Sequence, residues 1–313
     1  MRAAALLGLG AHRPARREGN SEIAARIGSS DEWIRERSGI VTRGVAEPQE
    51  TVVEMAIAAG GKALAAAGVD AADLDLVLLA TCSMPGPLPG GSPEVAARLG
   101  ARSAGTADVG AACAGFTYAL SMAADAVRAG SADRVLVIGS ERMLPLIDPQ
   151  DRGTAFLFGD GAGAVVVGVS ETDGIGRAAW ANDGDQRGRL VVEGTPPLMR
   201  MDGRAIYRWA ATSLPAIARR ACALAGTTPQ ELAAFVPHQA NLRITESVVK
   251  SLRLPESVVV ARDVVDSGNT SAASVPMALA RLHELGQVRR GDAVLLLGFG
   301  AGLTAAGQVV RCP

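Results

Sequence analysis

Aromatic, cysteine and histidine residues are scarce in this sequence, and neither sign of charge is in excess. Of 313 residues, 3% are aromatic, 4 are cysteines and 3 are histidines, and 31 Lys and Arg balance 32 Asp and Glu. A dedicated nucleic-acid binder would carry a basic excess, so no nucleic-acid partner is expected. The cysteines form no CxxC pair, which argues against a disulfide framework or a metal site and predicts a reducing, cytoplasmic location.

We expect neither a signal peptide nor a transmembrane segment. Its opening MRAAALLGLG leads into HRPARREGN and not into a small-residue cleavage site. The uncharged run at 293–310 is interrupted by glycines, so we expect a strand, a turn and a second strand, and no membrane partner. What is abundant is hydrophobic residues (48%) and glycine (37 residues), which predict an aliphatic core with closely approaching backbones.

Two parts of the chain resemble each other. ALAAAGVDAADLDLVLLATC (63–82) and ACALAGTTPQELAAFVPHQA (221–240) share an Ala-rich helix, a terminating glycine, a polar turn and an apolar strand. DRVLVIG (133–139) and DAVLLLG (292–298) repeat at nearly the same spacing. We therefore expect two similar α/β halves: 1–160, carrying the nucleophile discussed below, and 161–313, carrying a histidine and an asparagine.

The strand-like segments are continuously apolar, as at 77–81, 135–139, 164–168 and 294–298. Such runs are typical of strands covered on both faces, and helical stretches alternate with them. The sequence therefore predicts an α/β fold in which helices cover the sheets. The glycine-rich segments FGDGAGAVVVG (158–168) and LGFGAGL (297–303) lead into apolar runs and not into a helix, so they do not fit a dinucleotide site, and no cofactor is expected.

Cys113 is a candidate nucleophile because it lies among small residues just before a predicted helix. Free backbone N–H groups and the helix dipole would lower the pKa of its thiol, and its own amide would help to bind an oxyanion. The alternative is a cysteine that fills space in an Ala-rich turn, a role that we assign to Cys82, Cys222 and Cys312.

His238 and Asn269 are the other polar candidates. His238 ends an apolar strand in FVPHQANLR, where a hydrogen-bonded structural histidine is the alternative. Asn269 lies in a glycine-flanked turn, and its segment (268–282) repeats that of Cys113 with Ala272 at the position of the cysteine. A turn or N-cap role is the alternative there. All three candidates follow strand ends, where the sites of α/β proteins gather.

The sequence resembles the β-ketoacyl-acyl-carrier-protein synthase III family (KAS III) of the thiolase-like superfamily over nearly its whole length. The segments that carry the resemblance are SSDEWIRERSGI (29–40), ACAGFTYAL (112–120), DRGTAFLFGDGAGA (151–164), PHQANLRI (237–244), GNTSAASVP (268–276) and GFGAG (298–302). Asn269 within GNTSAAS points to the priming branch, which uses Cys-His-Asn where elongating relatives use Cys-His-His.

The resemblance implies a thiolase-like duplicated five-layer αβαβα sandwich that forms a homodimer. It also implies that an acyl-CoA acylates Cys113, and that malonyl-acyl-carrier protein then loses CO2 and condenses with the acyl-enzyme. His238 and Asn269 would stabilise the enolate, and the backbone N–H groups of Cys113 and Ala301 would form an oxyanion hole. Such an enzyme primes fatty-acid synthesis or selects a polyketide starter unit.

Substrate-binding positions follow from the same resemblance. The residues expected to bind CoA and its pantetheine arm are Trp33, Arg37, Arg152, Tyr207, Ala240 and Asn241. Arg208, Arg243 and Lys250 would form a basic patch for the acyl carrier protein. Leu88, where relatives often have a bulky aromatic residue, would gate the acyl pocket, in some relatives across the dimer.

Two other functions remain open from the sequence. One is an acyltransferase that moves an acyl group from Cys113 to an alcohol or amine without decarboxylation. The other is a noncatalytic partner subunit of a ketosynthase.

Overall fold

Two five-stranded mixed sheets form the frame of the molecule in the computed structural model, which describes residues 2–313. The strands of the first sheet, in spatial order, are β1 (Ala3–His12), β7 (Gly161–Ser170), β6 (Arg134–Glu141), β4 (Leu76–Ala80) and β5 (Gly105–Val109). Those of the second are β12 (Val259–Val260), β11 (Ala234–Pro237), β13 (Ala293–Gly300), β14 (Thr304–Arg311) and β8 (Ala179–Ala181). The four apolar runs and the strand–turn–strand at 293–310 are confirmed as strands of these sheets.

The two sheets have the same topology. In each sheet, three successive strands that start at one edge pair antiparallel: β1–β7–β6 in the first sheet and β8–β14–β13 in the second. The two remaining pairs of each sheet are parallel. β7 hydrogen-bonds to β1 and β6 in the first sheet, so the expected division at 160/161 falls before a strand that the first sheet needs. We propose that the first half ends after β7, near Ser170.

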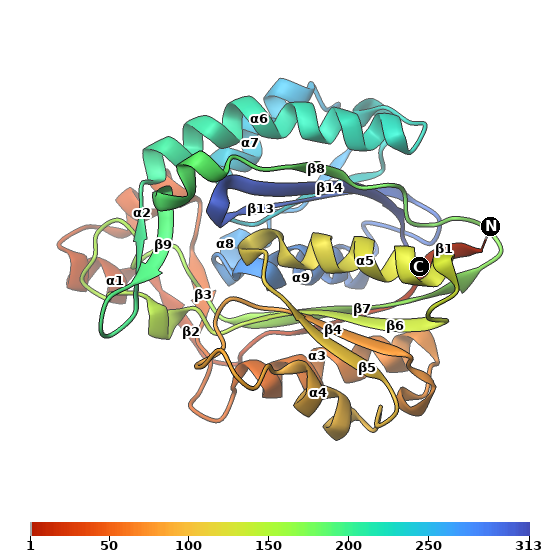
Figure 1. Ribbon diagram of the computed structural model, residues 1–313. Coiled ribbons are helices and arrows are strands. Elements are labelled where there is room, and N and C mark those ends of the chain that lie inside the picture. Colours follow the sequence, from red (N-terminus) through yellow and green to blue (C-terminus); the bar gives the residue numbers. More distant parts are fainter. Residues whose placement is uncertain (1) are drawn as a thin grey trace.

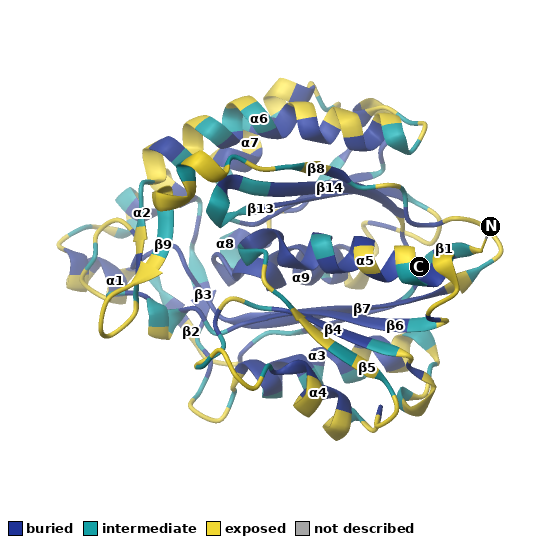
Figure 2. Cartoon of the chain, viewed as in Figure 1, coloured by how far each residue is buried: buried dark blue, intermediate teal, exposed yellow. Residues whose placement is uncertain are grey.

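Helices fill the spaces outside and between the sheets, in helix–sheet–helix–sheet–helix order (Figure 1). The covering helices are α3 (Val52–Ala67) and α4 (Ser92–Leu99) on the first sheet, and α6 (Gly203–Leu224) and α7 (Leu242–Leu252) on the second. Between the sheets lie α5 (Gly115–Ala129) and α9 (Ser274–Glu284). Figure 2 shows that these central helices and both sheets are mostly buried, whereas the outer helices expose one face. The α/β sandwich expected from the sequence is confirmed.

Smaller elements gather at one end of the sandwich, away from the two chain termini (Figure 1). They are α1 (Asn20–Ile27), α2 (Asp31–Ser38), α8 (Val264–Ser267), the hairpin of β2 (Arg17–Gly19) and β3 (Thr42–Gly44), and the hairpin of β9 (Leu190–Glu193) and β10 (Leu198–Met201). No helix within residues 2–313 has the length and apolarity to cross a membrane.

Local sequence signals explain where the helices begin and end. The Thr51 side chain accepts a hydrogen bond from the Glu54 N–H at the start of α3, and Gly68 ends that helix with φ +63°. The equivalent α6 ends at Leu224, and Ala225, whose N–H still bonds back to the Ala221 carbonyl, lies between the helix and the expected terminating Gly226. Gly226 then takes the positive φ (+68°) that turns the chain.

Glycine lets the central helix layer approach the sheets closely. A Cβ on Gly139, in β6, would lie 2.5 Å from the Ala272 carbonyl oxygen, at the turn that precedes α9. A Cβ on Gly300, in β13, would lie 2.8 Å from the Cys113 nitrogen, at the turn that precedes α5. Neither strand can carry a side chain there without displacing the backbone opposite, so the sandwich needs glycine at both positions.

We predict that Gly139→Ala destabilises the protein by about 1–3 kcal/mol, because the new methyl group meets backbone and not a side chain that can rotate away. The measurement is the free energy of unfolding in denaturant. Gly61→Ala is the matched control, since a Cβ there meets only a Leu99 methyl group at 3.9 Å inside α3. Equal stabilities for the two variants would contradict the close-packing argument.

Candidate active site

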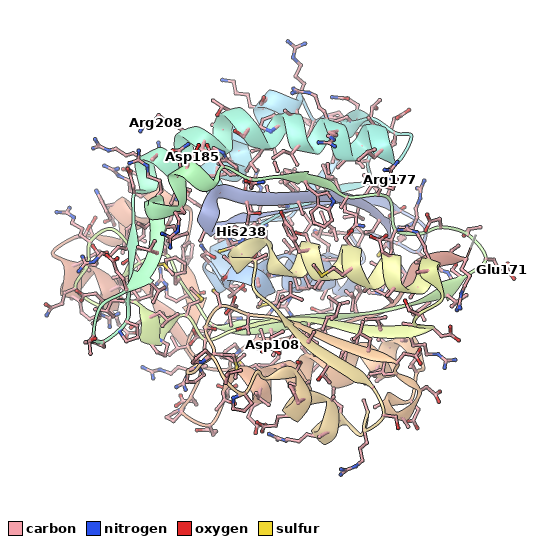
Figure 3. The ribbon with its side chains drawn as sticks, in the orientation of Figure 1. Asp108, Glu171, Arg177, Asp185, Arg208 and His238 are labelled. Carbon is pink, nitrogen blue, oxygen red and sulfur yellow. The ribbon has the colours of Figure 1, made fainter. Side chains whose placement is uncertain are left out.

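Residues from both halves of the chain line one inner cavity of about 120 Å³. Cys113, His238, Asn269 and Ala301 are all part of its wall, although they lie far apart in the sequence. Figure 3 shows His238 near the middle of the molecule, between the central helices and the second sheet. The structure therefore brings together the three candidate side chains that the sequence singles out.

Cys113 lies in a short 3-10 turn, Ala112–Ala114, directly before α5. The residue is only 7% exposed, and burial raises the pKa of its thiol to about 12. Hydrogen bonding by Ser271 lowers this pKa and the Glu141 carboxylate raises it, both to a smaller extent than burial. The lowered thiol pKa expected from the helix N-terminus is thus wrong, because loss of water around the sulfur outweighs the hydrogen bonds that lower the pKa.

His238 follows β11 and is 2% exposed. Its Nδ1 lies 2.6 Å from the Ser274 hydroxyl oxygen, and its ring packs edge-on against Phe299, with 5.0 Å between centroids. Burial lowers the pKa of the imidazole to about 3, so the ring is neutral at ordinary pH. With Nδ1 engaged by Ser274, Nε2 is the nitrogen that remains for a molecule in the cavity.

Asn269 is fixed in place by backbone pairing with a distant segment. Its N–H donates to the Leu157 carbonyl (2.8 Å), and its carbonyl accepts from the Gly159 N–H (3.0 Å). Its side-chain Oδ1 accepts the Ser271 N–H (2.9 Å). Because the amide oxygen is used in this way, the Nδ2 hydrogens are the donors that remain for a ligand.

A larger outer cleft of about 690 Å³ leads to the inner cavity, with which it shares Met201, Ile206, Ala240 and Asn269. All the residues expected to bind CoA line this cleft, namely Trp33, Arg37, Arg152, Tyr207, Ala240 and Asn241. The guanidinium carbons of Arg37 and Arg152 lie 5.2 and 4.9 Å from the centre of the Trp33 ring. A flat ring flanked by two cations suits a molecule with an aromatic base and phosphates.

Two of the three expected carrier-protein residues also line the outer cleft. Arg208 and Arg243 lie there, and Arg243 stacks over Tyr207 at 5.8 Å. Arg208 is on α6 at the outer surface (Figure 3). Lys250 is exposed on the same helix as Arg243, α7, but is not part of the cleft wall.

Leu88 is not a gate of its own chain's cavity. It is 87% exposed and does not line the inner cavity, because the Pro- and Gly-rich loop carries it outward. The β9–β10 hairpin supplies the apolar wall instead, through Leu190, Val191, Val192, Met199 and Met201. Residues 193–204 contain β10, which pairs with β9.

Several residues of the site were not predicted from the sequence. Ser271 and Ser274 lie within GNTSAASVP and contact Asn269 and His238 respectively. Cys82, taken above as a space-filling residue, lines the inner cavity together with Cys113. Glu141 is a fully buried carboxylate beside them. An acidic residue at the end of an apolar strand, as in VLVIGSE, is the signal that would have marked Glu141.

No group of three or more His, Cys, Asp and Glu side chains within the described part of the chain is arranged to hold a metal ion.

This sandwich, with a thiol, an imidazole and a carboxamide around one buried cavity, has the architecture of thiolase-like condensing enzymes. The family model 3-oxoacyl-[acyl-carrier-protein (ACP)] synthase III matches residues 107–184, and the model of its C-terminal part matches residues 222–312. The chain belongs to the β-ketoacyl-acyl-carrier-protein synthase III family.

Curated relatives and solved structures agree with this assignment. The chain is 50% identical to β-ketoacyl-[acyl-carrier-protein] synthase III 4 of Streptomyces coelicolor, over 97% of each chain. It is 46% identical to a synthase III of Mycobacteroides abscessus, over 98% of this chain and 94% of the relative. The crystal structure of the priming β-ketosynthase of the R1128 polyketide pathway superimposes with a TM-score of 0.98 at 47% identity, covering 100% of this chain and 97% of that one.

We predict that the rate of Cys113 alkylation by iodoacetamide rises about tenfold per pH unit from about pH 7 to about pH 10, because the thiolate reacts and its fraction is small throughout that range. The physical reason is the raised pKa of the buried thiol. Intact-protein mass gives the rate, and Cys113→Ala corrects for the other thiols. A plateau below pH 8 would show that the helix N-terminus outweighs burial.

Proposed function

We propose that this protein is a priming condensing enzyme in which an acyl group is first carried by Cys113. The observation that supports this is the inner cavity, where Cys113, His238 and Asn269 meet next to an outer cleft of about 690 Å³ that would hold a CoA or pantetheine arm. The activity is that of its family: condensation of an acyl primer with malonyl-acyl-carrier protein, in fatty-acid or polyketide initiation.

In the first step, acyl-CoA would occupy the outer cleft, with its adenine on Trp33 and its phosphates near Arg37 and Arg152. The Cys113 sulfur attacks the thioester carbonyl, the bond to the CoA sulfur breaks, and the thiol proton leaves with CoA. The backbone N–H groups of Cys113 and Ala301 would hold the oxyanion, and one such donor commonly contributes about 2.7–4 kcal/mol.

In the second step, malonyl-acyl-carrier protein takes the place of CoA. The neutral His238 ring, through Nε2–H, and the Asn269 Nδ2 would both donate hydrogen bonds to the thioester oxygen as negative charge develops on it. Loss of CO2 leaves an enolate whose carbon attacks the acyl-enzyme carbonyl, which forms the C–C bond and frees the Cys113 sulfur.

The carrier protein would dock at the mouth of the cleft, which its phosphopantetheine arm must enter. Arg208 and Arg243 line this mouth and Lys250 lies on the same helix as Arg243, so their charge would attract an acidic partner.

The four cysteines are free thiols, which supports a cytoplasmic location.

We predict that the protein gains the mass of an acyl group when it is incubated with a panel of acyl-CoAs, and that Cys113→Ala gains none. Addition of malonyl-acyl-carrier protein should then release CO2 and a β-ketoacyl product. An O- or N-acyl product without CO2 would instead indicate an acyltransferase. Acyl mass on the Cys113→Ala variant would refute the nucleophile, and no acyl mass on the wild type would indicate a noncatalytic subunit.

We further propose a homodimer that pairs through β5. This strand is at the edge of the first sheet and is largely exposed, so its outer hydrogen-bonding groups are open to a second copy. The exposed Met122 lies beside it, in a surface hollow lined by Ala107 and Val109. In such a dimer, the outward-pointing Leu88 would reach the partner and could gate the partner's acyl pocket.

We predict that sedimentation shows a dimer for the wild type and a shift towards monomer for Met122→Glu, because a charge would be buried at the interface. Leu285→Glu is the matched control, since Leu285 is 61% exposed at the end of α9, away from β5. A monomeric wild type, or dissociation of the Leu285→Glu control alone, would contradict this interface.

A further inference from the structure

Glu141, the last residue of β6, is a fully buried carboxylate surrounded by hydrogen-bond donors. No ion pair among residues 2–313 includes Glu141, and the donors that hydrogen-bond to its carboxylate are neutral hydroxyl, thiol and backbone N–H groups. Its donors from the end of β4 are the Thr81 hydroxyl (3.0 Å), the Cys82 N–H (3.1 Å) and thiol (3.3 Å), and the Ser83 hydroxyl (2.5 Å).

The same carboxylate reaches into the second half of the chain. Its Oε1 accepts the Ser271 hydroxyl at 2.9 Å and the Ala272 N–H at 3.3 Å. A buried carboxylate left without donors is costly, so the end of β4 and the turn that precedes α9 are held together wherever Glu141 stays buried.

Ser271 connects this carboxylate to the reactive carboxamide. Its backbone is in the left-handed region, with φ +47°, which a residue with a side chain adopts only when its surroundings enforce it. In that conformation its N–H donates to the Asn269 Oδ1, and this hydrogen bond decides which end of the amide faces the cavity. The Glu141 contacts to the Ser271 hydroxyl and to the Ala272 N–H hold this turn from the side of the first sheet.

We propose that Glu141 is a positioning residue for the condensation, and that it acts through Ser271 to keep the Asn269 amide turned with its Nδ2 towards the substrate. This inference rests on the proposed function, in which Asn269 stabilises the enolate. Glu141 itself touches neither the substrate nor the reacting atoms. It orients the donor used in decarboxylation and not the nucleophile used in acylation.

The charge of Glu141 has a second, opposite effect on the nucleophile. Cys82 and His238 are the other titratable groups of the inner cavity, and the lowered pKa of His238 and the raised pKa of Cys82 keep both neutral. Glu141 is therefore the charged group that acts on Cys113, and it raises the pKa of that thiol, whereas the Ser271 hydroxyl lowers it. We therefore expect removal of the Glu141 carboxylate and removal of the Ser271 hydroxyl to shift the pKa of the Cys113 thiol in opposite directions.

The test compares Glu141→Gln and Ser271→Ala in the full-length enzyme. Both variants should release CO2 from malonyl-acyl-carrier protein roughly 10- to 100-fold more slowly per acylated enzyme, since a small misplacement of a catalytic donor has an effect of that size. Both should still gain acyl mass from acyl-CoA. The pH profile of Cys113 alkylation should move to lower pH in Glu141→Gln and to higher pH in Ser271→Ala.

Asp160→Asn is the control for the loss of a buried carboxylate. Asp160 is 1% exposed and accepts the N–H groups of Ala46, Met143 and Leu144, but it does not line the inner cavity. This variant should lose stability and keep both half-reactions per folded molecule.

Unchanged CO2 release in Glu141→Gln, or an equal loss of acylation and CO2 release with an unshifted alkylation profile, would overturn the proposal. If Glu141→Gln does not fold, Ser271→Ala decides by the same two readouts. Absence of CO2 release from the wild type would refute the proposed function instead, and the two alkylation shifts, which need no substrate, would still decide whether Glu141 and Ser271 act on the thiol as stated.

Discussion

The close approach of the central helices to both sheets is the constraint on which the rest of the structure depends. Gly139 in the first sheet faces the backbone of Ala272 before α9, and Gly300 in the second sheet faces the backbone of Cys113 before α5. Each sheet thus fixes the short 3-10 turn that precedes a central helix, and residues of the site lie in or next to that turn. A wider spacing would fill with side chains or water, and the residues that now meet around one cavity would be separated.

Burial at this depth favours one half of the proposed chemistry and opposes the other. It keeps the His238 ring neutral, which is the form that can donate Nε2–H to a developing enolate when Nδ1 accepts from Ser274. It also keeps Cys113 protonated, which slows its attack on a thioester. The Ser271 hydroxyl offsets part of this penalty, and departure of the thiol proton with the leaving group avoids a free thiolate in the resting enzyme.

The sequence predicted the repeat, the apolar strands and three polar side chains that line the inner cavity, because each leaves a local pattern of periodicity or small residues around a polar one. It did not predict the contacts of Glu141, whose partners include Ser271 some 130 residues away. Nor could it predict the pKa of Cys113, since burial depends on the packing of both halves. The outward direction of Leu88 and the membership of β7 in the first sheet depend on tertiary pairing in the same way.

The duplication explains why two strained turns lie side by side. Ala112 and Ser271 occupy equivalent positions before α5 and α9, and both have φ +47°. In the first half this turn presents the next residue, Cys113, to the cavity. In the second half the next residue is Ala272, and the turn instead presents its own N–H to Asn269. The same strained conformation therefore serves two purposes in the two halves. The Glu141 carboxylate is needed only in the second half, where the Ser271 N–H must be held against the Asn269 side chain, which would otherwise rotate.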